Sequence, residues 1–438
     1  MENENLNADV DMSEESSIIE KNKKGKSKKI LVSLVALIVL MLIGGTAILY
    51  FCKLGRSEKS YLFSDNLLSV KVNGKWGYID KNNNIVVEPE YDKVYQFKDG
   101  IALVVKDKKY GYINTKGEYI IQPVYEDAYV FSQDLAAVQI DSKWGYIDKN
   151  GNMVIDAQFE SAYSFTEDGL ACVVLNKSKG YINKEGKFVI NPQYNYAYSF
   201  YSSYAKVQND THKYGVIDKK GNIVLDLKYS DMSSAPTRNL WCASLEKKYG
   251  YLNAENKYVI NPIYDDALDF SKTDNLAAVK LDGKWGYIDD KGNVKISMQF
   301  DSADTFVNGY AVVVSDKKYG IIDAKGNYTV NPQYDEIESL NEYSNLTYFR
   351  EGSKIGYIDV NGKIIVDAKF NALAKYEYSS STSYYAGTFR SDGYAVVRDG
   401  NKFGVIDSKG NYLIEPQYDG LMGYDKNSGS SNSTKKTK

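Results

Sequence analysis

The chain has 438 residues, enough for two to four ordinary domains or for one long repeat array. Its formal net charge of −3 lacks the basic excess typical of nucleic-acid-binding proteins, so no nucleic-acid partner is expected. Three cysteines are too few for a disulfide scaffold or a zinc cluster, and one histidine leaves little scope for the commonest general base. The 40 tyrosines and 34 glycines, against 7 prolines, favour strands and turns.

The first predicted element is a transmembrane helix at residues 30–52, a run without any charged side chain. In a helix this run spans about 34 Å, enough to cross a bilayer core of about 30 Å. Six lysines crowd residues 21–29, whereas few basic residues follow, so we expect a cytoplasmic N-terminus and an exported C-terminal part. The alternative is a cleaved signal peptide, but such peptides have a shorter apolar core. Residues 1–29 are predicted to be a disordered cytoplasmic tail and residues 53–65 a linker.

A tandem repeat fills residues 66–424. Each unit contains a version of Lys-Trp-Gly-Tyr, and the glycine of this tetrad is called the marker glycine below. Successive marker glycines are 34 to 36 residues apart, except for a last step of 48 residues that contains a Tyr/Ser-rich insertion. The ten marker glycines are Gly77, Gly111, Gly145, Gly180, Gly215, Gly250, Gly286, Gly320, Gly356 and Gly404. Residues 425–438 are predicted to be a disordered tail.

Each unit is expected to form three strands. In the third unit these are Leu135–Asp141, Lys143–Asp148 and Asn152–Ile155, with side chains alternating between two faces. Six residues after the marker, eight units have glycine and the other two have Asn83 and Asn256. These residue types tolerate a positive φ, so this position is predicted to be a left-handed turn residue.

Two further rows fix the register of the repeat. Twelve residues after the marker, six units have proline, which lacks an N–H and should lie at a sheet edge or end a ladder. Two residues further on, every unit has Tyr or Phe, from Tyr91 to Tyr418, and these aromatic residues are the best candidates for a continuous core. A single unit has too little apolar surface to fold alone, so neighbouring units must cover it.

The motif resembles the bacterial WG repeat. The segments Asp148-Lys149-Asn150-Gly151-Asn152 and Pro332-Gln333-Tyr334-Asp335 carry the resemblance, which extends over the whole repeat region, although Trp itself stays only at Trp76, Trp144 and Trp285. The resemblance implies a bacterial surface or secreted β-repeat protein with no established catalytic activity. We expect an open or superhelical array, because ten units of three strands differ from the usual four to eight four-stranded propeller blades. The alternative is a closed, propeller-like ring.

The polar residues of the repeat are predicted to be structural. Turns such as Asp148–Asn152 resemble calcium loops, but they lack a second clustered acid, and Asx hydrogen bonds explain them. His212 is interpreted as a hairpin residue. Cys172 and Cys242 are assigned to a small-residue core row, since other units have alanine there. The acids that follow the aromatic row are predicted to be solvated charges, with an acidic binding strip as the alternative. They are Asp92, Glu126, Glu160, Asp265, Asp301, Asp335 and Asp419.

The function expected from the sequence is binding or scaffolding at the outer face of a membrane. No paired acids, nucleophile and base, or metal-ligand spacing stand out from the repeat, so no enzyme, cofactor or metal is predicted. The ligand is predicted to be a cell-wall glycan or a surface protein; a structural spacer or a signal-sensing ectodomain is the alternative. Aromatic side chains are the candidate binding residues because they stack on sugars and peptides. They are Trp76, Tyr78, Trp144, Tyr146, Trp285 and Tyr287.

Overall fold

The computed structural model describes residues 60–201, 203–372, 387–422 and 424–425. The predicted cytoplasmic tail, the apolar run 30–52 and most of the predicted linker lie outside these residues, as do the Tyr/Ser-rich insertion and nearly all of the C-terminal tail. In the described residues, no helix is long and apolar enough to cross a bilayer. The anchor therefore remains a prediction.

The strand that carries the marker glycine is the second strand of each unit. Its glycine cannot be replaced without moving the backbone: a Cβ on Gly145 would lie 2.5 Å from the carbonyl oxygen of Ile155. The following strand bulges toward this glycine, which explains why a strand interior contains glycine at all. The second strands are β2 (Lys75–Ile79), β6 (Lys109–Asn114), β10 (Lys143–Ile147), β14 (Ser178–Ile182), β18 (Tyr214–Asp218), β22 (Lys248–Leu252), β26 (Lys284–Ile288), β30 (Lys318–Asp323), β34 (Lys354–Asp359) and β37 (Lys402–Asp407).

The first strand of each unit pairs with the second through a tight hairpin, and both faces of it are largely buried. Small and β-branched residues fill it because a neighbouring unit packs on each face. The first strands are β1 (Leu68–Val72), β5 (Ile101–Lys106), β9 (Ala136–Ile140), β13 (Ala171–Leu175), β17 (Tyr204–Gln208), β21 (Trp241–Leu245), β25 (Ala277–Leu281), β29 (Tyr310–Ser315), β33 (Leu346–Glu351) and β36 (Tyr394–Asp399).

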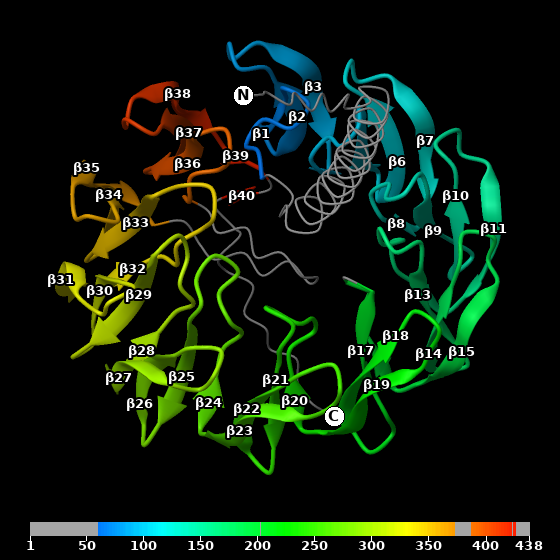
Figure 1. Ribbon diagram of the computed structural model, residues 1–438. Helices are drawn as coiled ribbons and strands as arrows, with labels where there is room; N and C mark the ends of the chain where they lie inside the picture. The colour runs from blue at the N-terminus through cyan, green and yellow to red at the C-terminus, as the bar shows by residue number, and fades with distance from the viewer. Residues whose placement is uncertain (1–59, 202, 373–386, 423, 426–438) are drawn as a thin grey trace, which may run out of the picture. The chain divides into compact units, whose positions relative to one another are not determined.

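The third strand lies at the outer edge of each sheet and ends on the aromatic row (Figure 1). It alternates between exposed and buried side chains, as expected for an edge strand with one covered face. The six prolines of the predicted row therefore lie on edge strands, as predicted. The third strands are β3 (Ile85–Tyr91), β7 (Tyr119–Tyr125), β11 (Met153–Phe159), β15 (Phe188–Tyr194), β19 (Ile223–Tyr229), β23 (Tyr258–Tyr264), β27 (Val294–Phe300), β31 (Tyr328–Tyr334), β35 (Ile364–Asn371) and β38 (Tyr412–Tyr418).

A fourth strand, which the sequence did not predict, follows directly after the aromatic row. It has only two residues, and it pairs with the first strand of the next unit, so nine of the ten sheets combine residues of two successive repeats; in the described residues the sheet of β36, β37 and β38 has three strands. These short strands are β4 (Lys93–Val94), β8 (Asp127–Ala128), β12 (Ser161–Ala162), β16 (Tyr196–Ala197), β20 (Asp231–Met232), β24 (Asp266–Ala267), β28 (Ser302–Ala303), β32 (Glu336–Ile337) and β39 (Gly420–Leu421).

The ten sheets are the blades of a closed β-propeller (Figure 1). They are numbered 1 to 10 here by the marker glycine that each contains. The ring closes because β39, near the end of the described chain, pairs with β1: Val70 lies opposite Leu421, and Lys71 opposite Gly420. A last strand, β40 (Tyr424–Asp425), extends this sheet, so the C-terminal tail begins slightly later than predicted. The expectation of an open array is therefore wrong, and the closed alternative is confirmed.

The N-terminal end of the ring also starts earlier than predicted. Leu62 and Phe63, which the sequence analysis placed in the linker, are buried against blade 10 in one cluster with Leu421. Blade 1 is therefore assembled from both ends of the repeat region. We call the contact between blades 10 and 1 the seam.

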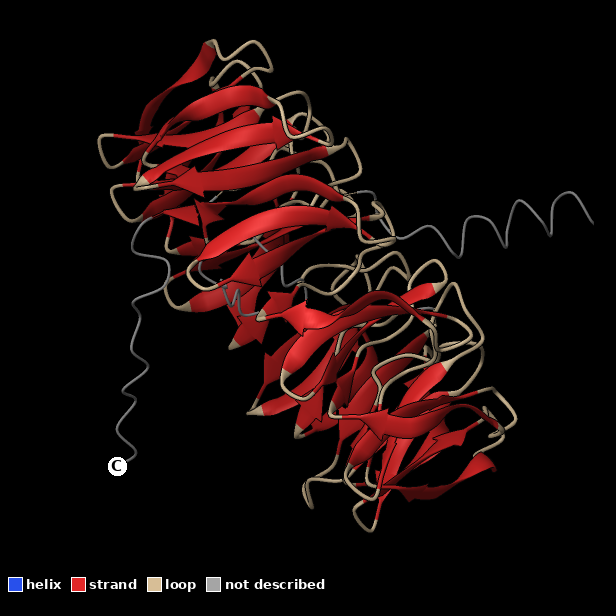
Figure 2. Ribbon diagram, turned by 90° about the vertical axis from the view of Figure 1, so that its left-hand side faces the viewer, coloured by secondary structure: helices blue, strands red, loops and turns tan. Residues whose placement is uncertain are grey.

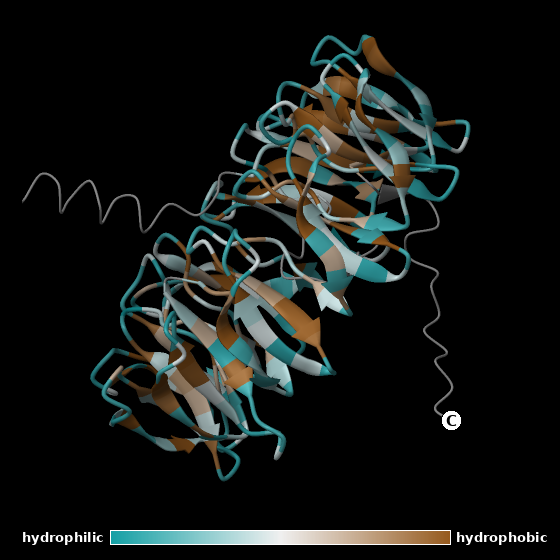
Figure 3. Ribbon diagram, turned by 90° about the vertical axis from the view of Figure 1, so that its right-hand side faces the viewer, coloured by the Kyte–Doolittle hydropathy of each residue, from teal (hydrophilic) through white to brown (hydrophobic). Residues whose placement is uncertain are grey.

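Loops and turns divide between the two faces of the ring. The loop from each short strand to the first strand lies on the same face as the turn between the second and third strands, and the tight hairpins lie on the other. Figure 2 shows the longer loops gathered on one side. Hydrophobic residues concentrate along the strands and hydrophilic ones at the turns (Figure 3). We call the side with the longer loops the loop face.

Candidate functional site

The six aromatic residues predicted to bind a ligand all lie in the interior. Trp76, Trp144 and Trp285 are between 5 and 8% exposed, and Tyr78, Tyr146 and Tyr287 at most 1%. These side chains pack between adjacent blades, so they do not offer the open aromatic face that stacking on a ligand requires. A binding role for these residues finds no support in their exposure.

The tyrosine after the marker glycine instead ties neighbouring blades together. The Tyr146 hydroxyl donates a hydrogen bond of 2.8 Å to the carbonyl oxygen of Tyr163 in the loop of the next blade, and its ring packs on Phe165 at 4.9 Å between centroids. Burial raises the pKa of Tyr146 far above its usual value, so the hydroxyl stays protonated and can donate. The signal that sequence analysis missed is the phenylalanine 20 residues after the marker. It recurs as Phe97, Phe131, Phe165, Phe200, Phe270 and Phe306.

The calcium-like turns are held by their own hydrogen bonds. In the turn Asp148–Asn152, the Asp148 carboxylate accepts hydrogen bonds from the backbone N–H groups of Asn150 and Asn152, each at 2.9 Å. The side-chain amide of Asn152 donates another, and these bonds lower the pKa of Asp148. The turn residues Gly151, Asn83 and Asn256 all have positive φ, which confirms the predicted left-handed position. In the described part of the chain, no group of three or more His, Cys, Asp or Glu is arranged to hold a metal ion.

The acids after the aromatic row form ion pairs in half of the units. Asp301, for example, lies 2.6 Å from the ammonium group of Lys284, which lowers the pKa of Asp301. These exposed pairs contribute little energy individually. Acids of this row also accept hydrogen bonds from the backbone of the hairpins, as Asp335 does from Gly352 N at 2.7 Å and Glu126 from Ser142 N at 2.9 Å. These acids are therefore bonded within the repeat itself.

The cysteines and the histidine lie where the sequence predicted. Cys172 and Cys242 are buried free thiols in the predicted small-residue core row. Burial raises the pKa of Cys172 to about 12. His212 lies in the longer hairpin of blade 5 with a φ of 58°, and its Nδ1 is 3.3 Å from the side-chain amide of Asn195. Neither arrangement provides an activated nucleophile.

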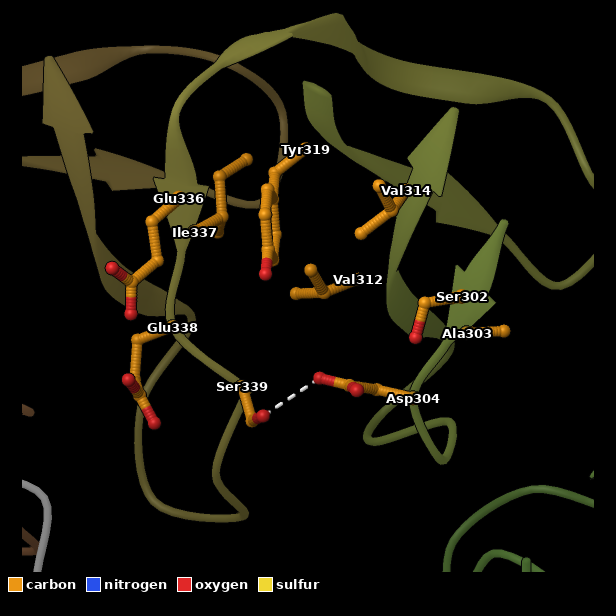
Figure 4. A pocket seen from close by; sticks show the side chains of 10 residues that line it. All are labelled: Ser302, Ala303, Asp304, Val312, Val314, Tyr319, Glu336, Ile337, Glu338 and Ser339. Atoms are coloured by element: carbon orange, nitrogen blue, oxygen red, sulfur yellow. Dashed lines mark hydrogen bonds between the residues drawn. The ribbon is translucent and has the colours of Figure 1, made fainter. Parts of the chain in front are cut away.

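One cavity, of about 170 Å³, opens between blades 8 and 9 (Figure 4). Glu336 and Glu338 form one wall, with Asp304 opposite, and Ser339 donates a hydrogen bond of 2.6 Å to Asp304. Its origin is a change of side-chain size. Eighteen residues after the marker, four earlier units have tyrosine, and in blade 3 the ring of Tyr129 packs on Trp144. In blade 8 the corresponding residue is Asp304, which leaves this space unfilled.

The carboxylates of this first cavity already have protein partners. Glu336 accepts a hydrogen bond from Arg350 Nε at 2.9 Å, and Glu338, only 3% exposed, accepts one of 2.6 Å from the Tyr348 hydroxyl. Buried carboxylates require such partners, so these contacts account for the cavity as part of the blade interface.

A second cavity, of about 410 Å³, lies at the seam on the loop face. Loops of blades 10, 1 and 2 line it, and they include Tyr61, Asp65, Lys81, Asp99 and Asp392. This seam cavity has both signs of charge and an exposed aromatic ring. None of its residues belongs to the predicted set, although several recur with the repeat: Phe63 and Phe97 are 34 residues apart, as are Asp65 and Asp99.

A buried charge cluster joins blades 5, 6 and 7. The Lys206 ammonium donates a hydrogen bond of 2.8 Å to the carbonyl oxygen of Met232 and lies over the rings of Tyr198 and Tyr214, at 4.4 and 4.8 Å from their centroids. Burial lowers the pKa of Lys206 and raises that of Asp269 to about 6. Lys206 takes the position in the first strand that Cys172 and Cys242 occupy in their units. Its aliphatic carbons fill the interface that a small residue would leave open.

Comparison with known families decides the identity of the repeat. The WG containing repeat matches ten segments: residues 76–110, 110–144, 144–177, 180–210, 214–236, 249–285, 285–319, 319–354, 355–379 and 403–427. The chain belongs to the WG-repeat family. The match confirms the resemblance found in the sequence and the ten units on which the blade count rests.

Other comparisons add less about this WG-repeat protein. No curated protein matches the chain. Among solved structures, it is similar to a eukaryotic initiation factor (12% identity, TM-score 0.49, 81% of this chain and 97% of that one). It is also similar to BamB from Moraxella catarrhalis (10%, 0.34, 61% and 91%) and to PorZ of Porphyromonas gingivalis (9%, 0.26, 80% and 57%), a bacterial surface component of the type-IX secretion system. With every TM-score below 0.5, these similarities carry no inference about function.

Proposed function

We propose that this WG-repeat propeller is a non-catalytic binding protein that recognises a cell-wall glycan on the outer side of a membrane, anchored by residues 30–52. One observation carries the proposal: the recurring aromatic side chains of the strands are used in packing between blades, whereas the larger cavity is lined by loop residues, among them the exposed Tyr61. Loops that a rigid scaffold positions are the usual place for binding residues. The lysines before the apolar run support the proposed orientation.

The test is co-sedimentation of the full chain, in detergent, with insoluble peptidoglycan. Retention that a soluble wall polysaccharide competes away is the expected result, since a binding site saturates. Retention that no soluble glycan reduces would indicate adsorption and contradict the proposal. So would absence of retention combined with specific capture of a surface protein.

The seam favours a second role, that of a sensor. Ser60 accepts a hydrogen bond of 2.7 Å from Ser391 N in blade 10, and it lies directly after the segment that leads from the proposed anchor. A ligand at the seam would act on the chain segment nearest the membrane. Deleting residues 1–29 should then abolish the response to ligand while leaving glycan binding intact; an unchanged response would argue against sensing.

A further inference from the structure

The seam cavity is built from fixed walls. Asp65 accepts a hydrogen bond of 2.8 Å from Gly100 N, which joins the loops of blades 1 and 2. On the other side, Asp392 accepts hydrogen bonds from the backbone N–H groups of Leu62 and Phe63, at 3.0 and 3.1 Å. Three blades therefore hold the cavity in one geometry before any ligand binds, which reduces the entropic cost of binding.

The cavity offers an aromatic surface beside polar groups. Tyr61 is 42% exposed, unlike the tyrosines that directly follow the marker glycines. Lys81 lies over Phe63 and Tyr394, with its ammonium 5.6 and 5.8 Å from the ring centroids. The corresponding lysine of blade 3, Lys149, is instead ion-paired with Asp134 at 2.7 Å. The Lys81 ammonium thus stands at the mouth of a cavity rather than against a carboxylate.

The charges select the class of ligand. Three carboxylates, those of Asp65, Asp99 and Asp392, disfavour an anionic ligand, and Lys81 and Lys98 disfavour a purely cationic one. A neutral molecule with many hydroxyl groups satisfies both sets, because each hydroxyl donates to a carboxylate and accepts from an ammonium group. Its C–H face would pack on the tyrosine ring. At about 410 Å³ the cavity is within the range of small-ligand pockets.

From these observations we infer that the seam cavity is the saccharide-binding site of the propeller, with Tyr61 as the stacking platform and Asp65, Asp99 and Lys81 as hydrogen-bonding partners. This inference rests on the proposed glycan-binding function and assigns it a place. Because the saccharide contacts loops of blades 1 and 2 and Asp392 of blade 10 together, it also stabilises the seam, and ligand binding raises the resistance of the ring to unfolding.

The experiment measures binding of two soluble probes, a β-1,4-linked tetrasaccharide of N-acetylglucosamine and the corresponding glucose tetrasaccharide, to the full chain in detergent by calorimetry. Tyr61→Ala should weaken binding of the preferred tetrasaccharide by about tenfold or more, because the stacking surface is lost. Tyr201→Ala is the matched control, since Tyr201 is an exposed tyrosine (56%) on the loop of blade 5, away from the seam. That variant should bind like the parent protein.

Three results distinguish the site from the function. Loss of binding in Tyr61→Ala but not in Tyr201→Ala, with the parent protein melting at a higher temperature in the presence of saccharide, supports the site. Equal binding by Tyr61→Ala and the parent protein overturns the site while the glycan-binding function stands. Absence of binding to both tetrasaccharides and to insoluble peptidoglycan overturns both. Circular dichroism of each variant confirms that the strands are intact.

Discussion

The interface between blades 3 and 4 and the seam between blades 10 and 1 both hold a connecting loop against the neighbouring blade, but through different hydrogen bonds. In the first, the Tyr146 hydroxyl and the Phe165 ring bind the connecting loop to the preceding blade. At the seam the tyrosine is replaced by Val405, which has no hydroxyl to donate. The loop there is held from the opposite direction, by the Asp392 carboxylate that accepts from Leu62 and Phe63 backbone.

The seam also contains a hydrogen bond that recurs between two neighbouring blades elsewhere in the ring. Tyr418 of blade 10 donates a hydrogen bond of 2.7 Å to Asn83 in the turn of blade 1, and Tyr229 of blade 5 donates one of 3.0 Å to Asn256 of blade 6. These are the two units in which asparagine replaces the turn glycine. A ring can therefore close on itself when the ends of the chain reproduce the interface that neighbours already share. The following predictions compare the two interfaces.

The largest effect is expected from removing the phenylalanine of each interface. Phe165→Ala should lower the free energy of unfolding by about 3–5 kcal/mol, because a buried ring leaves a cavity. Phe63→Ala should cost about as much if the seam is packed equally well. Denaturant titration of the two full-chain variants measures the difference. A negligible loss for Phe63→Ala would mean that the seam contributes little to the stability of the ring.

The marker glycines should be almost as sensitive. In Gly145→Ala the new Cβ meets the Ile155 carbonyl oxygen at 2.5 Å, and in Gly404→Ala it meets that of Ile414 at 2.5 Å. We expect each substitution to cost about 3 kcal/mol through forced backbone movement. Gly169→Ala, at a positive φ but with open space around it, is the control and should cost only about 1 kcal/mol. Equal losses at all three positions would contradict the close approach of the third strand.

A pH-dependent effect should appear away from the seam, at Asp269. Its folded pKa of about 6 lies above the usual unfolded value of about 3.9, so the folded state binds more protons between these pH values. The contribution of Asp269 to the free energy of unfolding is therefore fully present below about pH 4, and it is lost as the pH rises through 6. Asp269→Asn should be more stable than the parent chain at pH 8, by up to about 2 kcal/mol, and similar at pH 4. Burial is the main cause of the raised pKa of Asp269, while the charge of Lys206 lowers this pKa and that of Asp231 raises it. A parallel pH dependence of the two proteins would contradict the assignment.

The smallest effect concerns the shared tyrosine–asparagine bond. Tyr418→Phe and Tyr229→Phe should each cost about 1 kcal/mol, the usual value of a hydrogen bond. In a double-mutant cycle with Asn83→Gly, the coupling to Tyr418 should account for most of that loss. A coupling near zero would show that the bond adds nothing to closure.

Local features of the repeat could be predicted from the sequence because short-range rules set them. Positive φ at Asn83 and Gly151 follows from turn chemistry, and the buried places of Cys172 and Cys242 follow from the alternation of side chains in a strand. The candidate site could not be predicted in the same way. Tyr78 and Tyr146 look like binding residues until their neighbours are known. Tyr61 shares the 34-residue spacing of Tyr95 and Tyr129, and only its exposure in the structure distinguishes it.

What the sequence by itself determined is the unit: ten hairpin-based repeats that cannot cover their own apolar side chains. Tertiary structure alone decided that the units form a ring, that two residues such as Asp127–Ala128 add a fourth strand to nine of the ten sheets, and that Leu62 and Leu421 meet at the seam. The physical reason is that closure depends on the rotation between successive blades, summed over the whole array. A small angle set by packing at each interface fixes that sum, and no single repeat encodes it.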